Sequence, residues 1–206
     1  MITLNVEQKR FILMKLKPFL KKNNIFDIRY SILCDARSNA GTGNLNLSEV
    51  TDIAGWLYEV LGTDYFVGST WVDHEEFAYS HLTHMVLPEY IQSIEQQAFN
   101  KSDLTSIELN EGLTHIRALA FNISKLKKVV IPNSVVYIGT SAFANTELDS
   151  VEFQGYGQLN IEADDELFSG NKKSMTIILP KNKELAFYGD YDSLDNWIEK
   201  YNVKFV

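Results

Sequence analysis

Apolar and polar positions recur with a fixed period of 22 residues through the middle of the chain. Three segments align without gaps, and they begin at Leu82, Leu104 and Leu126. The first half of each segment contains apolar residues at alternate positions, such as Ile107 and Leu109 in "LTSIEL", and this alternation predicts a short strand with one buried side. A fixed period of this length predicts coils that stack and bury each other's apolar edges, because one coil cannot bury its edge alone.

An Ala-Phe pair lies four residues before the end of each segment, at Ala98-Phe99, Ala120-Phe121 and Ala142-Phe143. We interpret the small residue as the one that lets the backbones of adjacent coils approach, and the large residue as the filling of the interior. Phe77 continues the interval one coil earlier, and Leu167-Phe168 replaces the pair after an insertion of about three residues. The pattern therefore predicts an interior column formed by Phe77, Phe99, Phe121 and Phe143.

The C-terminal stretch has a different spacing, which is typical of a helix. Ser193 is the expected N-cap, and four apolar residues lie on one predicted helical face: Leu194, Trp197, Ile198 and Tyr201. We expect this amphipathic helix to close the end of the stack, because terminal repeats must cover an otherwise open core.

Residues 1–62 show no repeat. Their patterns predict a helix that breaks near Pro18, a strand over "IFDIRYSIL", a loop over "DARSNAGTGNLN" and a second helix that Ser48 caps and Gly62 ends. The sequence thus predicts two domains, a small N-terminal α+β unit over 1–62 and a solenoid over 63–206. The fold class is α+β.

The repeat resembles the BspA-like, bacterial surface-antigen type of leucine-rich repeat. "VVIPNSVVYIGTSAFANTEL" carries the segments of that family's pattern, an "IP" after a strand, a "VxxIG" segment and an "AF" pair. The resemblance covers about residues 65–206. It implies a right-handed solenoid with short parallel strands on one face, and protein or glycan binding in place of catalysis.

The repeat register predicts which strand residues face outward. Residues between two inward positions form one row, and a second row lies two positions earlier on each strand. Solenoids use such surfaces for extended contacts, although β-propensity alone would also place Val and Ile there. The predicted protein-binding residues are His84, Val86, Glu108, Lys128, Val130, Glu152 and Ile178.

Composition and charge limit the classes of protein to which the chain can belong. The chain has 206 residues, one Cys and a net charge of −8, so it needs no disulfide to fold. No apolar run approaches the length of a membrane span, and no signal peptide is recognisable. We therefore expect a cytoplasmic protein, in a bacterial or host cytoplasm.

Charge is unevenly distributed along the chain. Residues 1–37 contain eight Lys and Arg residues against three Asp and Glu residues, and the remainder contains 11 against 24. This asymmetry could steer a charged partner or simply keep the surface soluble.

Four groups of reactive residues do not assemble into a recognisable site. His74, His81 and His84 with nearby Glu residues lack a matching ligand set in other coils, so we expect no metal. "NAGTGNLNLSEV" lacks the Lys of a phosphate-binding loop. Cys34 has no His nearby in sequence, and Asp164, Asp165 and Glu166 are typical of a solvated turn. We expect no cofactor and no enzymatic activity.

The sequence favours a non-enzymatic protein–protein interaction module with an unidentified protein partner. The alternative is a phage- or mobile-element-encoded inhibitor of a host defence or nucleic-acid-binding protein, resembling an anti-CRISPR, whose acidic surface would mimic phosphates. Direct binding of nucleic acid would need the Lys residues of the first helix, and the acidic body disfavours it. The oligomeric state is left open at this point.

Overall fold

The computed structural model of the chain describes residues 54–55, 58–59, 62–66, 69–162, 166–189 and 192–206. The chain divides into two compact units, Met1–Ser69 and Thr70–Val206. In the first unit, the ring of Tyr65 at the end of the 3₁₀-helix η2 (Gly62–Phe66) packs edge-on against Tyr58, with 6.3 Å between ring centroids. The helices and strand predicted before residue 54 lie outside the described residues. The domain division at residues 62 and 63 stays a prediction.

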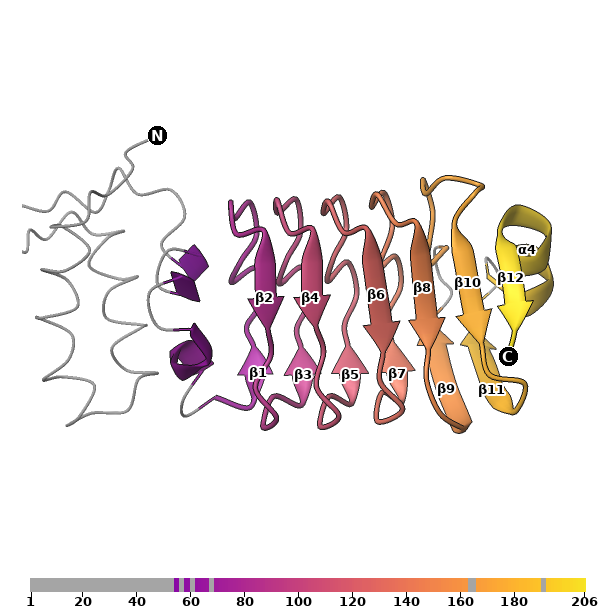
Figure 1. Cartoon of the computed structure of the whole chain (residues 1–206), viewed down its shortest axis with the longest axis horizontal. Coiled ribbons are helices and arrows are strands. Elements are labelled where there is room, and N and C mark those ends of the chain that lie inside the picture. Colours follow the sequence, from indigo (N-terminus) through magenta and orange to yellow (C-terminus); the bar gives the residue numbers. More distant parts are fainter. Residues whose placement is uncertain (1–53, 56–57, 60–61, 67–68, 163–165, 190–191) are drawn as a thin grey trace, which may run out of the picture. The chain divides into compact units, whose positions relative to one another are not determined.

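The second unit is a solenoid whose coils each contribute a strand to two parallel sheets (Figure 1). One sheet contains β1 (Trp71–Val72), β3 (Ser93–Ile94), β5 (His115–Ile116), β7 (Tyr137–Ile138), β9 (Gly157–Glu162) and β11 (Lys183–Tyr188). The other contains β2 (His84–Val86), β4 (Ser106–Glu108), β6 (Lys128–Ile131), β8 (Ser150–Phe153), β10 (Thr176–Leu179) and β12 (Asn202–Phe205). The predicted solenoid of short parallel strands is confirmed. The β1–β11 sheet was not predicted, because its first four strands have two residues each, too few for an alternating pattern.

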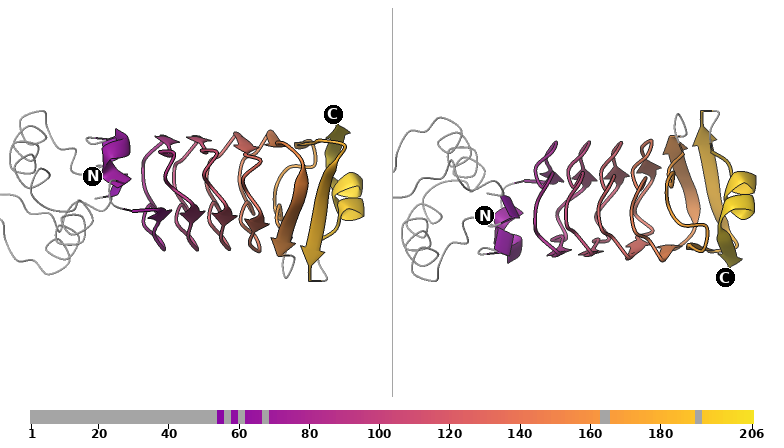
Figure 2. Two further views of the ribbon diagram at one scale, coloured as in Figure 1. Left: turned by 90° about the horizontal axis from the view of Figure 1, so that it is seen from below. Right: turned by 90° about the horizontal axis from the view of Figure 1, so that it is seen from above.

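The repeat period sets the register of both sheets. His84 pairs with Ser106 and Ser106 pairs with Lys128, each 22 residues further along the chain. In the other sheet, Ser93 pairs with His115 in the same way. Seen from below and from above, the coils consequently follow one another side by side along the solenoid (Figure 2). Equal offsets keep every inward residue above an inward residue, so the core continues from coil to coil without a break.

A column of aromatic rings runs through this core. Phe77, Phe99, Phe121 and Phe143 are each buried, and successive ring centroids lie 5.3, 5.2 and 5.2 Å apart. The planes of adjacent rings differ by 10°, 2° and 9°, which is a stacked arrangement. Stacked rings at this separation attract each other in addition to the area that they bury. The predicted column is confirmed.

The Ala residues let the coils approach as predicted. The backbone N–H of Phe99 donates to the carbonyl of Ala120 at 2.8 Å, and Phe121 donates to Ala142 at the same distance. Where Leu167 replaces Ala, the corresponding bond from Phe143 lengthens to 3.2 Å, and the rings of Phe143 and Phe168 separate to 6.1 Å. The larger Leu side chain therefore coincides with a wider separation at the Phe rings alone, because the next bond between these coils, from Asn145 to Ser169, is 2.6 Å.

The backbone around each Phe alternates between right- and left-handed conformations. Gln97 and Lys101, two residues before and after Phe99, have φ values of 59° and 57°, and Ile123 repeats this with 57°. The N–H groups of Gln97 and Lys101 then point along the solenoid and donate to Ala118 and Asn122 in the next coil. A left-handed conformation costs roughly 1–2 kcal/mol for an L-residue. The hydrogen bonds between coils offset this cost and give the solenoid a third bonded side.

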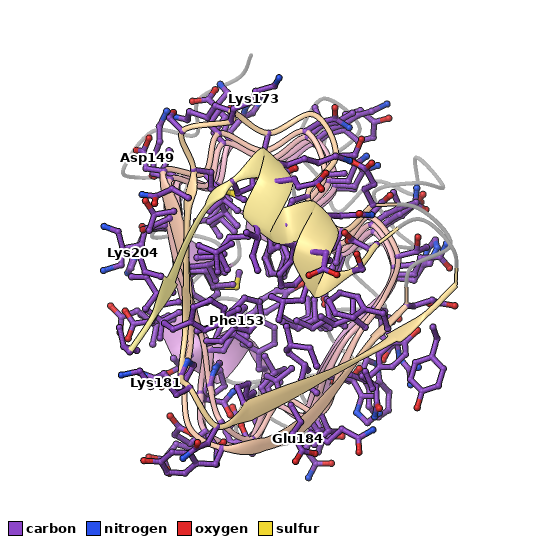
Figure 3. All side chains as sticks on the ribbon, turned by 90° about the vertical axis from the view of Figure 1, so that its right-hand side faces the viewer. Asp149, Phe153, Lys173, Lys181, Glu184 and Lys204 are labelled. Atoms are coloured by element: carbon purple, nitrogen blue, oxygen red, sulfur yellow. The ribbon has the colours of Figure 1, made fainter. Side chains whose placement is uncertain are left out.

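The C-terminal helix α4 (Leu194–Lys200) covers the end of the core (Figure 3). Ser193 caps it by accepting a hydrogen bond from the N–H of Asn196, as predicted, and Trp197 is buried against Phe168, with ring centroids 5.1 Å apart. The carboxylate of Asp192 accepts from the indole N–H of Trp197 at 2.6 Å and from the N–H of Leu167 at 2.9 Å. Ile198 is exposed, so the expectation that it lies on the buried face is wrong.

Truncating the middle of the column should cost much of the stability of the solenoid. We expect Phe121→Ala to lower the free energy of unfolding by about 3–5 kcal/mol, because it leaves a cavity between two stacked rings. Urea unfolding of the full chain measures this. The matched control is Tyr156→Ala, whose ring is 70% exposed; we expect a change within about 0.5 kcal/mol. Equal effects of the two substitutions would contradict the buried column.

Asp192 gives the cap a dependence on pH. Burial raises the pKa of the Asp192 carboxyl above its ordinary value of 3.8, although the bonds from Leu167 and Trp197 oppose this. The stability that protonated Asp192 contributes is full below pH 3.8 and is lost as the pH rises through the raised folded-state pKa. We expect the unfolding free energy of the native chain, relative to Asp192→Asn, to fall as the pH rises from 3.8. Parallel stability curves for the two proteins would contradict this.

Candidate functional site

The outer side of the β2–β12 sheet, named here the β2 face, presents two rows of side chains. The strand register aligns the rows across the whole sheet. Row one consists of His84, Ser106, Lys128, Ser150, Thr176 and Asn202, and row two of Val86, Glu108, Val130, Glu152, Ile178 and Lys204. All seven residues predicted for protein binding lie on this face. Their role in binding stays a prediction.

Charge and side-chain size alternate along the β2 face with a period of two strands. Over the first four strands, row two reads Val, Glu, Val, Glu, while row one reads His, Ser, Lys, Ser. A strand with a basic residue in row one therefore has Val in row two, and the next strand has Ser and Glu. His84, Glu108 and Lys128 are exposed, and Val86, Val130 and Ile178 are half-buried. The face thus combines small apolar patches with isolated charges.

Few of these charges are neutralised within the face. The Nε2 atom of His84 lies 3.9 Å from a carboxylate oxygen of Glu108. Lys128 and Glu152 form no ion pair with any residue that the structure describes. Because neighbouring strands of a sheet lie about 4.8 Å apart, these charges stand at regular intervals and are accessible to a partner.

Three neighbouring side chains on the β2 face, Ser106, His84 and Glu108, are of the types that serve as nucleophile, base and acid in catalytic sites. The Nδ1 atom of His84 is 2.8 Å from the hydroxyl oxygen of Ser106, and the other ring nitrogen faces Glu108. The side chains of His84 and Glu108 are 53% and 70% exposed. Water screens the charges of such exposed groups, and catalytic groups of this kind act in sites from which water is excluded. The arrangement fits a polar surface better than an active site.

The other candidate metal ligands lie apart from one another. His81 contacts Asp103, with 2.8 Å between Nδ1 and the carboxylate, and Lys125 contacts the other oxygen of Asp103 at 2.6 Å. Hydrogen bonds from His81 and then Lys125 hold the pKa of Asp103 below its ordinary value. His74 pairs only weakly with Glu75, at 4.0 Å. Within the described residues, no three His, Cys, Asp or Glu residues form a group that could hold a metal.

The outer side of the β1–β11 sheet, named the β1 face, carries aromatic residues that the sequence analysis missed. The guanidinium of Arg117 lies 5.5 Å from the centroid of the Tyr137 ring, and the ring of His115, on the neighbouring strand, lies 5.7 Å from the same centroid. Tyr137 donates a hydrogen bond to Glu162, and Arg117 approaches Glu95 at 4.0 Å. Burial, followed by the charge of Arg117, lowers the pKa of His115. The polar groups of this face thus bind each other.

Two comparisons place the chain among known proteins. A model of the BspA type leucine rich repeat region matches residues 70–191 in six copies. Among solved structures, the pneumococcal vaccine antigen PcpA is similar, with 26% sequence identity and a TM-score of 0.52. That match covers 58% of this chain and 32% of the PcpA chain, so the matched part spans about a third of that protein. No curated protein sequence matches. These findings give no support to the phage-borne inhibitor or its phosphate-mimicking acidic surface.

Several predicted features lie outside the described residues: the basic first helix, Cys34, the glycine loop before Ser48, and Asp164 and Asp165. Glu166 is described, and it forms an ion pair with Lys200. In the described part of the chain, no helix has the length and apolar composition of a membrane span.

Adjacent substitutions on β6 test which residues face outward. Val129 is 1% exposed and points into the core, whereas Val130 belongs to row two of the β2 face. We expect Val130→Lys to change the free energy of unfolding by less than about 0.5 kcal/mol. Val129→Lys buries an unpaired charge and should cost more than about 3 kcal/mol. Urea unfolding of both variants decides, and a severely destabilised Val130→Lys variant would show that the register is wrong.

Proposed function

Because the chain belongs to the BspA-type leucine-rich repeat family, we propose that its solenoid is a non-enzymatic protein-interaction module that binds through the β2 face. Repeats of this family are typically interaction scaffolds, and leucine-rich repeats generally mediate binding between proteins. The proposed contact residues are His84, Val86, Glu108, Lys128, Val130, Glu152 and Ile178.

The alternation of charge and size on the β2 face is the observation that carries this proposal. Six strands in register hold the contact residues on a rigid sheet, so little conformational entropy is lost when a partner binds. Lys128 and Glu152 have no ion-pair partner among the described residues. Charged groups of this kind steer association and fix the alignment of a partner.

The β1 face supports binding less well. Tyr137 already packs against the guanidinium of Arg117 and donates a hydrogen bond to Glu162, while Arg117 lies 4.0 Å from the carboxylate of Glu95. A partner would have to break these contacts before it could form new ones, and each unsatisfied polar group would then cost free energy. The two faces thus form a natural pair of test and control on one molecule.

Site-specific photo-crosslinking distinguishes the faces. A benzophenone amino acid placed at Ser106 or Ser150 on the β2 face of the full chain should give covalent protein adducts in cells that express the chain naturally. The same amino acid at Ser93, on the β1 face, is the matched control and should give none. We expect adduct formation at Ser106 and Ser150 to weaken when Val130→Lys is added.

The outcome at the control position is as informative as that at the test positions. Adducts from Ser93 alone would move the binding surface to the β1 face. The absence of adducts at all three positions would contradict a protein-interaction role for either sheet face.

A further inference from the structure

We propose that the partner of the β2 face is the β2 face of a second copy of this chain, related by a two-fold axis parallel to the solenoid axis. This inference rests on the proposed function and specifies its partner. In this arrangement two solenoids lie side by side and point in the same direction, with their β2–β12 sheets face to face. Packed sheets lie about 10 Å apart, which leaves one layer of interdigitating side chains between them.

The two-fold axis places each row of one copy opposite the other row of the second copy. Because the axis runs along the solenoid, each strand meets its own counterpart, and row one meets row two on that strand. Ser106 then faces Glu108 of the second copy, and Ser150 faces Glu152 of the second copy. A small residue lies opposite a larger one, and the Ser hydroxyl can donate a hydrogen bond to the carboxylate.

Lys128 provides the main charge complementarity. It faces Val130 of the second copy, whose neighbours in row two are Glu108 and Glu152. These carboxylates lie one strand to either side, at a spacing of about 4.8 Å. The Lys128 ammonium, which has no ion-pair partner among the described residues, would therefore stand between two carboxylates of the second copy, and the symmetry repeats this contact.

The other in-plane axis, parallel to the strands, does not give this match. If it passes along β4 or β6, it brings Lys128 opposite His84 or Lys128 of the second copy, and Glu opposite Glu. If it passes along β8, it pairs Glu108 with Lys204 but sets Glu152 against Glu152. If it passes between β4 and β6 or between β6 and β8, strands with Val or Ile in row two meet strands with Glu there. Each Glu then lies against a Val or Ile, and Lys128 lies against a Ser. Like charges in contact, or charges buried without a partner, both disfavour association. Only the axis along the solenoid places Lys128 between two carboxylates of the second copy.

The expected dimer is weak. Six strands span about 24 Å between the first and last, and two rows cover on the order of 500 Å² per copy, below the roughly 800 Å² per partner of a standard interface. We therefore expect a dissociation constant in the micromolar range or above, and an association that decreases with salt because charges dominate it.

Exchanging the charges tests the inference directly. Lys128→Glu in the full chain places three carboxylates together at each contact, and we expect it to weaken dimerisation at least about tenfold. Glu108→Lys with Glu152→Lys places three ammonium groups together and should have the same effect. A mixture of the two variants restores both contacts, so it should form a heterodimer. Lys173→Glu, an exposed position outside the face, is the control for the change of net charge.

Sedimentation velocity from micromolar to near-millimolar concentration measures each association, and circular dichroism checks that each variant is folded. Two variants that are monomeric alone and dimeric when mixed would establish the proposed contact. A native chain that stays monomeric, or a dimer that all the variants retain, would overturn it. A monomeric chain whose Ser106 and Ser150 probes still capture a different protein would overturn this inference alone and leave the proposed function standing.

Discussion

Ring-on-ring packing between coils is the interaction on which the rest of this solenoid depends. Phe77, Phe99, Phe121 and Phe143 stack at 5.2–5.3 Å, and this spacing is close to the distance between neighbouring strands in a sheet. The match between the two distances lets the same coil satisfy its backbone hydrogen bonds and its aromatic contact. Each coil thus touches only its neighbours, and stability accumulates along the stack.

The binding surface follows from the same constraint. A constant offset between coils keeps inward residues above inward residues, and it necessarily keeps outward residues above outward residues as well. The outward positions carry no packing requirement, so their chemistry can vary without loss of the fold. On the β2 face they alternate in charge and size, whereas on the β1 face Tyr137 binds both Arg117 and Glu162. The first arrangement leaves charges for a partner, and the second uses them internally.

Sequence patterns predicted the core of the solenoid better than its surface. The Phe interval, the strands of the β2–β12 sheet and the Ser193 cap are local or periodic features, and the structure confirms them. The β1 face escaped prediction because a strand of two residues, such as β5, has no detectable alternation. Ile198 was wrongly predicted to be buried. Helical periodicity indicates which side of a helix is apolar, but it does not indicate how much of that side the neighbouring coil covers. The left-handed residues around each Phe were also missed, since Gln97, Lys101 and Ile123 are not residues that such turns favour.

A double-mutant cycle along the aromatic column tests nearest-neighbour stacking most directly. Phe99→Leu and Phe121→Leu, alone and together in the full chain, yield the coupling free energy of two adjacent rings from urea unfolding. Stacking predicts a coupling of about 0.5–1.5 kcal/mol for this pair. It predicts additive effects for Phe77 and Phe143, which are separated by two intervening rings. Additive effects for the adjacent pair, or equal coupling for both pairs, would contradict the account.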